Sequence, residues 1–204
     1  IANSDEKVYD GDELTNDGYT VENLPEGFTV EAVVEGSQTD VGNTPNVVTS
    51  YVIYDENGQD VTDQFTNVTT VDGELTVTPK PVTVTLTGHV GEEVYDGTEK
   101  TVTGYDVTIS EDSYTEADFT YSGTSVATGT LVGEYPLDLQ LDKLTNNIPN
   151  YDVTFVVNPG KLTILSVELS VTKTSDKTGK KVAPGEKITY TITVENKGSL
   201  IVTN

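Results

Sequence analysis

The chain has 204 residues, of which 34% are hydrophobic, and it carries a formal net charge of −23 with no cysteine. This acidity disfavours nucleic acid and anionic membranes as partners, and the missing cysteines exclude disulfides. No apolar run approaches the roughly 20 residues that a membrane-spanning helix needs, so we expect no membrane insertion.

The sequence repeats itself at an offset of 86 to 91 residues. Such tandem repetition is typical of a stalk or an array rather than of an enzyme built around one cleft. The recurring segments are Val8-Tyr9-Asp10-Gly11 with Val94-Tyr95-Asp96-Gly97, Gly18-Tyr19 with Gly104-Tyr105, Val41-Gly42 with Val132-Gly133, and residues 73–77 with residues 160–164.

Hydrophobic residues alternate with polar ones in several short segments, as in strands with one buried face. Turn residues separate these segments, with Asn57-Gly58 as a hairpin-type turn, and only residues 113–119 suggest a helical turn. The pattern predicts an all-β protein of small modules, for which an Ig-like sandwich is favoured and a β-grasp-like fold is the alternative. The predicted strands cover residues 28–34, 47–54, 82–86, 151–157 and 188–194.

Two boundaries divide the chain. Pro79-Lys80-Pro81 predicts a stiff, extended joint outside any central strand. A softer boundary, Leu165-Ser166-Val167, follows the second closing strand. We therefore expect β modules at residues 1–79 and 80–165, arranged as a rod, and a partial third module at residues 166–204. The first module lacks a counterpart of strand 82–86, and the third has too few strands, so we expect a piece of a longer protein.

The Tyr-Asp-Gly motifs, at Tyr9, Asp10 and Gly11 and at Tyr95, Asp96 and Gly97, admit a catalytic or binding interpretation. The alternative is architectural, with a buried Tyr at a strand end, an Asp that caps its own turn and a Gly at a special backbone angle. Because the motif occurs once in each module, we favour the architectural interpretation and expect both copies to occupy equivalent places.

Catalytic and metal sites have little support. His89 is the only histidine and cannot form a triad or a zinc site without partners. Residues 55–60 and the acidic residues of 5–17 could collect a cation, but the former lacks the ligand pattern of a calcium loop and both are equally solvated surface. The sequence thus indicates no catalytic, cofactor-binding or metal-binding residues, and we expect no enzyme activity.

In two predicted strands, Lys173 and Asn196 fall on the same face as the apolar residues. A charged Lys would be costly to bury there. One explanation is a Lys–Asn isopeptide bond, and the other is a Lys that reaches water and an Asn that caps the next turn. With Pro184-Gly185 as the connecting turn and no carboxylate on the same parity, we expect the two side chains to lie close together but unreacted.

The two repeats resemble the Tyr-Asp-Gly and related MBG-type modules of large bacterial surface proteins, through residues 7–11, 93–97 and 73–82. Residues 169–174 and 182–198 resemble a conserved repeat domain of unknown function from Gram-positive cell walls. The resemblance implies an extracellular location, attached to the cell wall or secreted. It implies no activity and no ligand site.

The expected function is that of a non-catalytic stalk segment of a bacterial cell-surface adhesin, monomeric and without cofactor. The alternative is a module that binds a host glycan or protein directly, and a third option is an accessory region of a carbohydrate-active enzyme. A Tyr-lined groove in both modules would favour binding, whereas Tyr rings buried in both would favour the stalk. The host or matrix ligand is not identified by the sequence.

Overall fold

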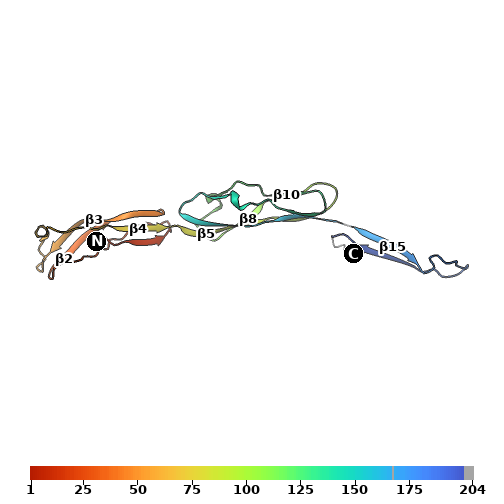
Figure 1. Ribbon diagram of the computed structural model, residues 1–204, viewed down its shortest axis with the longest axis horizontal. Coiled ribbons are helices and arrows are strands. Elements are labelled where there is room, and N and C mark those ends of the chain that lie inside the picture. The colour runs from red at the N-terminus through yellow and green to blue at the C-terminus, as the bar shows by residue number, and fades with distance from the viewer. Residues whose placement is uncertain (167, 200–204) are drawn as a thin grey trace. The chain divides into compact units, whose positions relative to one another are not determined.

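A computed structural model describes residues 1–166 and 168–199 and confirms the all-β class, with several small sheets of the kind that form β-sandwich domains (Figure 1). The chain divides into two compact units, whose boundaries differ from those of the sequence repeats. The first contains residues 1–83, 110–119 and 146–154, and the second contains residues 84–109, 120–145 and 155–204.

The first repeat is built on a four-stranded sheet in the order β1-β4-β3-β2. Its strands are β1 (Asp5–Val8), β2 (Thr29–Glu35), β3 (Gly42–Tyr54) and β4 (Gly73–Thr78), with a 3-10 turn, η1, at Thr62–Gln64. β1 pairs with β4 in parallel, while β3 pairs antiparallel with both β4 and β2. The first and last strands of the repeat are therefore neighbours.

The second repeat distributes its strands over smaller sheets, in the orders β13-β5-β8, β11-β14-β6, β10-β7 and β12-β9. Its elements are β5 (Lys80–Gly88), β6 (Val90–Val94), β7 (Lys100–Thr103), β8 (Tyr105–Ile109), η2 (Glu116–Asp118), β9 (Phe119–Tyr121), β10 (Val126–Gly129), β11 (Gly133–Pro136), η3 (Leu141–Lys143), β12 (Leu144–Asn146), β13 (Tyr151–Asn158) and β14 (Lys161–Leu165).

One ladder is common to both repeats. In the first, Val8 pairs with Thr78 and Gly42 with Val77; in the second, Val94 pairs with Leu165 and Gly133 with Ile164. The parallel pair β1–β4 of the first repeat thus corresponds to the parallel pair β6–β14 of the second. The antiparallel pair β3–β4 corresponds in the same way to β11–β14. The two repeats share these strands in the same register, as the repeat interpretation requires.

Buried side chains follow the strand period of two. In the first repeat, Leu75 and Val77 of β4 pack with Leu14, and Tyr9 and Val41 complete this cluster. In the second, Leu162 and Ile164 of β14 are equally buried. The repeated Leu-Thr-Val/Ile sequence is therefore the inward face of the shared closing strand.

The joint between the repeats differs in one respect from the prediction. Pro79 lies outside the strands, as expected, but Pro81 lies within β5, the middle strand of its sheet. The pairing of β5 with β8 begins only at Val84, so on that side of β5 no ladder hydrogen bond requires the N–H that Pro81 lacks. The exclusion of Pro81 from a central strand was wrong for this reason.

Two smaller predictions hold. The helical turn predicted for residues 113–119 is η2, whose Thr115 and Asp118 form a capping box. At the predicted hairpin turn, Gly58 has φ = 74° and its N–H donates to the Asp55 carbonyl. Glycine is suited to this positive φ, which completes the return of the chain after β3.

The last strands are β15 (Leu169–Ser175) and β16 (Tyr190–Asn196), which pair antiparallel with each other. All seven residues of β16 are exposed. Leu169, Val171, Ile192 and Val194 lie on one face of this hairpin, between 52% and 64% exposed.

Candidate functional site

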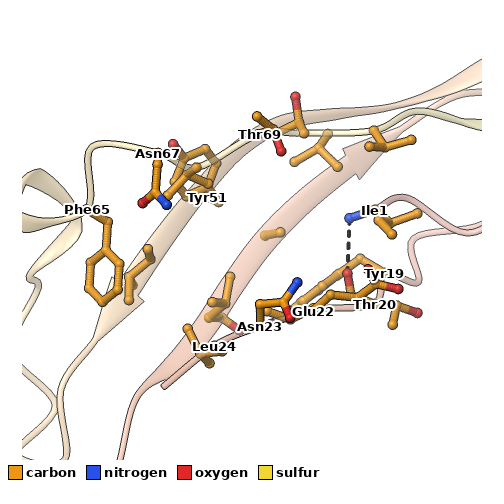
Figure 2. Close-up of a pocket in the computed structure, with 18 of the residues that line it drawn as sticks. Ile1, Tyr19, Thr20, Glu22, Asn23, Leu24, Tyr51, Phe65, Asn67 and Thr69 are labelled. Atoms are coloured by element: carbon orange, nitrogen blue, oxygen red, sulfur yellow. Dashed lines mark hydrogen bonds between the residues drawn. The ribbon is translucent and has the colours of Figure 1, made fainter. Parts of the chain in front are cut away.

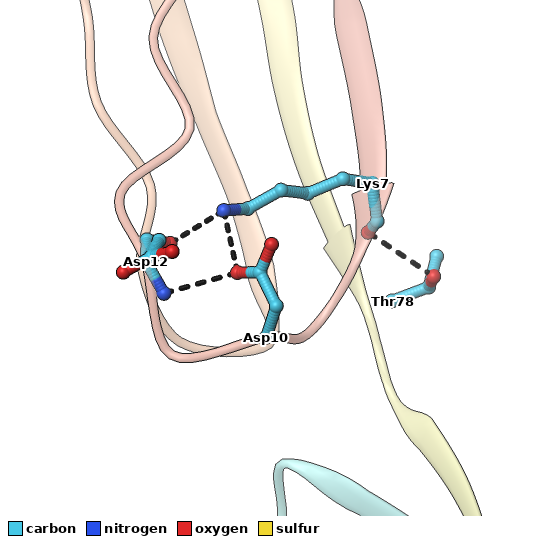
Figure 3. Close-up of polar contacts among 4 residues, drawn as sticks. All are labelled: Lys7, Asp10, Asp12 and Thr78. Carbon is cyan, nitrogen blue, oxygen red and sulfur yellow. Dashed lines mark hydrogen bonds and ion pairs between the residues drawn. The ribbon is translucent and has the colours of Figure 1, made fainter.

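The first Tyr-Asp-Gly motif forms a tight turn at the end of β1 (Figure 3). Asp10 Oδ1 accepts hydrogen bonds from Lys7 Nζ at 2.7 Å and from the Asp12 N–H at 3.0 Å, and Lys7 Nζ also donates to the Asp12 carbonyl. The hydrogen bond from Lys7 and then that from Asp12 lower the pKa of the Asp10 carboxyl. Gly11 follows with φ = 87°.

The second motif repeats this arrangement with different partners. Asp96 Oδ1 accepts from the N–H and the hydroxyl of Thr98, and Asp96 Oδ2 accepts from Lys100 Nζ at 2.8 Å. Led by the bond from Lys100, these bonds hold the pKa of the Asp96 carboxyl well below its usual range. Gly97 has φ = 83°, like Gly11. Both Asp side chains thus cap their own turns, as the architectural interpretation requires.

The two motif tyrosines have the same backbone position but different surroundings. The N–H of Tyr9 donates to the Thr78 carbonyl and that of Tyr95 donates to the Leu165 carbonyl, both at 2.9 Å. Tyr9 is half-buried, whereas Tyr95 is 45% exposed. The expectation of equivalent placement is met, but the expectation of a buried Tyr was wrong for Tyr95.

Tyr9 is covered by residues that follow the first repeat in sequence and belong to the same compact unit. Its ring meets the ring of Tyr151 edge to face, with centroids 5.6 Å apart. Tyr151 in turn meets Tyr114 at 5.1 Å, and Tyr114 is only 2% exposed. Edge-to-face contacts of this kind stabilise by roughly 0.5–1.5 kcal/mol beyond the area they bury.

Residues 146–151, called here the docking loop, hold this contact in place. Asn146 organises the loop: its Nδ2 donates to the carbonyls of Ile148 and Tyr151, and its Oδ1 accepts from the Ile148 N–H. The Tyr114 hydroxyl donates to Asn146 Oδ1 at 2.9 Å. The conformation of the loop is therefore held by hydrogen bonds that involve no residue of the first repeat.

Asn150 of the docking loop binds the end face of the first repeat, which consists of Tyr9, Asp40 and Val41. Its Oδ1 accepts from the Val41 N–H at 2.9 Å, and its Nδ2 donates to Asp40 Oδ1 at 2.8 Å. Its backbone carbonyl accepts from the Lys80 N–H at 3.0 Å. The side chain of Asn150 thus binds residues 40–41, and its backbone carbonyl binds Lys80, so one residue connects two segments far apart in sequence.

Lys80, in the proline-flanked joint, is held at its other end as well. Its Nζ forms an ion pair with Glu111 at 2.6 Å, and this hydrogen bond to Glu111 is the main cause that raises the pKa of Lys80. Both ends of the joint residue are therefore fixed within the first compact unit.

The first repeat also contains a pocket of about 350 Å³. Figure 2 shows Tyr51, Phe65 and Asn67 on one side of it and Tyr19, Thr20, Glu22 and Asn23 on the other. Apolar side chains of β2 and β3, among them Ala32 and Ile53, also line it. The pocket lies where segments without regular structure cover the sheet.

Some polar groups of this pocket are used and some are not. The Tyr19 hydroxyl donates to the Val30 carbonyl at 2.8 Å, and the backbone nitrogen of Ile1 donates to the Thr20 carbonyl at 3.0 Å. In the part of the chain that the structure describes, the side chains of Glu22, Tyr51 and Asn67 have no hydrogen-bond partner. The pocket therefore offers hydroxyl, amide and carboxylate groups beside apolar walls.

The structure contradicts the predicted closeness of Lys173 and Asn196. Lys173 pairs with Ile192 and Asn196 with Leu169, so the two residues share a face but lie four positions apart, about 13 Å along the strands. Lys173 Nζ instead lies 4.2 Å from the centroid of the Tyr190 ring, and Asn196 Oδ1 accepts from the Gly198 N–H. The Asn thus caps its following turn, which was the alternative explanation.

The predicted turn at Pro184-Gly185 forms, since the Glu186 N–H donates to the Ala183 carbonyl, but the two strands do not run directly into it. A hairpin with only this turn between its strands would have placed Lys173 opposite Asn196. The strands are instead joined by the whole segment 176–189, in which Asp176 and Thr189 bond to each other and Glu186 folds back onto Ala183. This longer connection shifts the register by four residues.

The other candidate residues serve local structure. Asp55 Oδ1 accepts from the N–H groups of Asn57 and Gln59, which form the hairpin turn. His89 lies with Nδ1 2.8 Å from the Thr103 carbonyl and Nε2 3.4 Å from Asp106 Oδ1. Over residues 1–166 and 168–199, no three or more His, Asp or Glu side chains are grouped as a metal ion would require.

Three residues that organise these contacts were not singled out in the sequence. Tyr114 and Asn150 act through residues far away in the chain, and Asn46 is fully buried in the first repeat, where its Nδ2 donates to the carbonyls of Asn3 and Asn16. A weak signal existed for Asn46, since it directly precedes the predicted strand 47–54. For Asn150 the only signal was the Pro149-Asn150 pair, which indicates a turn but not its partner.

Within the described residues, no helix is long and apolar enough to cross a membrane. Comparison with protein-family models, with curated proteins and with solved structures found no match to this chain. The resemblance to Tyr-Asp-Gly surface modules and to the cell-wall repeat domain therefore stays a prediction that rests on the motifs themselves.

Proposed function

We propose that this chain is a non-catalytic structural segment of a bacterial cell-surface adhesin, extracellular and either wall-attached or secreted. The observation that carries the proposal is the docked end face of the first repeat. Tyr9 and Val41 bind the docking loop at Tyr151 and Asn150, across a joint whose Lys80 is also fixed. Successive modules with such junctions would hold a distal binding region away from the cell.

Several hydrogen bonds at one junction matter because each contributes little alone. A typical net contribution is about 1 kcal/mol, and the edge-to-face ring contact adds a similar amount. Prolines at positions 79 and 81 restrict the joint further, because they fix their own φ angles. Together these terms favour one arrangement of the joint over a flexible linker.

Charge and the motif chemistry agree with a structural role. The net charge of −23 makes neighbouring copies repel one another, which favours monomers that stand apart. The carboxylates of Asp10 and Asp96 are both committed to their own turns. This use of the most conspicuous acids argues for architecture over catalysis.

Spin labels test the junction directly. The chain has no cysteine, so Cys introduced at exposed Ser50 and Thr128 would carry the only labels. We expect a narrow distance distribution by double electron–electron resonance, and a clearly broader one after Tyr9→Ala with Asn150→Ala. A broad distribution in the otherwise unchanged chain would contradict the stalk proposal.

A second candidate function is direct binding of a host glycan or protein at the pocket of the first repeat. Unpartnered Glu22, Tyr51 and Asn67 beside apolar walls favour it. The tyrosines of the two repeats favour different functions. Tyr51 of the first repeat lines a pocket, which favours binding, whereas Tyr114 of the second is buried, which favours the stalk. Screening the chain and its Tyr51→Ala variant on glycan arrays and matrix proteins tests this candidate, which requires binding that the variant loses.

A further inference from the structure

The second repeat carries a counterpart of the end face that the docking loop covers. Its residues are Tyr95, Leu131 and Val132, here called the second end face, and they correspond to Tyr9, Asp40 and Val41 through the shared register. Gly42 pairs with Val77 and Gly133 with Ile164, while the N–H groups of Tyr9 and Tyr95 bond to the equivalent carbonyls of Thr78 and Leu165. The two faces thus share the same strand register and the same backbone hydrogen bond of the motif tyrosine.

The faces differ in what covers them. Tyr9 and Val41 are half-buried, whereas Tyr95, Leu131 and Val132 are 45%, 65% and 48% exposed. The Val41 N–H donates to Asn150, but the Val132 N–H has no hydrogen-bond partner among the residues that the structure describes. The second end face therefore presents an apolar patch with a free backbone donor at its centre.

We propose that the second end face docks a further β module that presents a loop of the same chemistry as residues 146–151. In such a loop, an Asn side-chain carbonyl accepts from the Val132 N–H and an aromatic ring packs edge-on against Tyr95. The surface is the kind already used within this chain, where the docking loop makes both contacts with Val41 and Tyr9.

One sequence difference between the two end faces indicates what the partner's loop should contain. Asp40, which accepts from Asn150 Nδ2, is replaced by Leu131 at the equivalent position. A partner suited to the second end face therefore has an apolar group beside its Asn, or leaves the amide in water. Replacing Leu131 with Asp would recreate the first end face and should improve docking of a loop with the sequence of residues 146–151.

This proposal rests on the stalk function, because it makes the motif tyrosine the docking residue of each module. It is tested in the full chain with a second copy of residues 79–165 inserted after Leu165, so that the same joint follows the same strand. The measurement is amide hydrogen exchange by NMR at the Val132 that precedes the insertion, with Val41 as the internal reference.

We expect the Val132 amide to exchange quickly in the chain of 204 residues and roughly tenfold more slowly after the insertion, as one net hydrogen bond allows. Asn150→Ala in the inserted copy should restore fast exchange, and Leu131→Asp should slow it further. Tyr95→Ala should also restore fast exchange.

Two results would overturn the proposal: fast Val132 exchange while the core amides of the inserted copy are protected, or slow Val132 exchange already without the insertion. Neither result affects the spin-label test of the first junction, which depends on Tyr9 and Asn150. Failure of this docking surface and failure of the stalk function are therefore distinguishable.

Discussion

The two repeats share their closing ladder and differ in how they fill the space beside it. Leu75 in the first and Leu162 in the second are both inaccessible to solvent on equivalent strands. Yet the first repeat buries the polar Asn46 and leaves a pocket of about 350 Å³, while the second buries Val84, Leu86, Leu137 and Ile164.

This difference shows which part of the module is architectural. The strands that recur in sequence define the ends of each repeat, where chain entry, chain exit and docking take place. The segments between them, which vary in sequence, determine how well the interior is packed. We therefore expect the two repeats to respond differently to the same substitution.

The largest effect is expected for the two equivalent leucines. Leu162→Ala and Leu75→Ala should each reduce the free energy of unfolding by about 2–5 kcal/mol, and Leu162→Ala should cost more. The reason is that tightly packed neighbours cannot close a cavity, whereas the irregular segments of the first repeat can. Urea unfolding measures both variants, with exposed Leu131→Ala as the control; a larger loss at Leu75 would reverse the comparison.

Asn46→Ala tests the polar interior of the first repeat. It leaves the buried carbonyls of Asn3 and Asn16 without their donor, so we expect a loss of about 1–3 kcal/mol. Exposed Asn43→Ala on the same strand is the matched control. Asn46 Oδ1 has no partner among the described residues, so a stabilising Asn46→Leu variant would show that this unpaired atom outweighs the two bonds.

The motif tyrosines give the next comparison. Tyr9→Ala removes a docked ring and should cost about 1–2 kcal/mol, whereas Tyr95→Ala removes an exposed ring and should cost under about 0.5 kcal/mol. Thermal unfolding of the two variants measures the difference directly. Equal losses would mean that the contact between Tyr9 and Tyr151 contributes nothing to stability.

The smallest effect concerns pH. The folded pKa of Asp96 lies below its ordinary value of 3.8, so its bonds stabilise the fold fully above that pH and less as pH falls toward the folded pKa. Asp96→Asn should therefore lower the melting temperature slightly at pH 7, and the difference from the parent should shrink below about pH 4. Asp10→Asn should do the same to a lesser degree. A difference that grows on acidification would contradict this assignment.

Local patterns were sufficient for the longer strands β2, β3, β5, β13 and β16, for the repeat register and for the turn chemistry of Asp10 and Asp96. These features depend on alternation and on contacts within a few residues, which the sequence displays directly. The repeated Gly-x-Leu-Thr-Val/Ile segment marked the closing strand of each repeat, which the structure contains as β4 and β14.

Non-local contacts were beyond such reasoning. Nothing near Asn150 indicates that it binds Val41, more than 100 residues away, because that pairing depends on how whole strands are placed. The predicted closeness of Lys173 and Asn196 was wrong for a related reason. The alternation of residues along a strand determines which face a side chain lies on, but not the register between two strands. The pocket was unpredicted because it arises where irregular segments fail to fill a volume.

The parallel pairing of β1 with β4, and of β6 with β14, has a mechanical consequence. In each pair the strand near the start of the repeat and the strand that leaves it run in the same direction. In the first repeat, whose first strand is β1, a force that pulls the two ends apart acts along β1 and β4 in opposite senses and loads their ladder in shear. The hydrogen bonds of that ladder would have to break together rather than one after another, so we expect this repeat to resist extension better than its small core alone would allow.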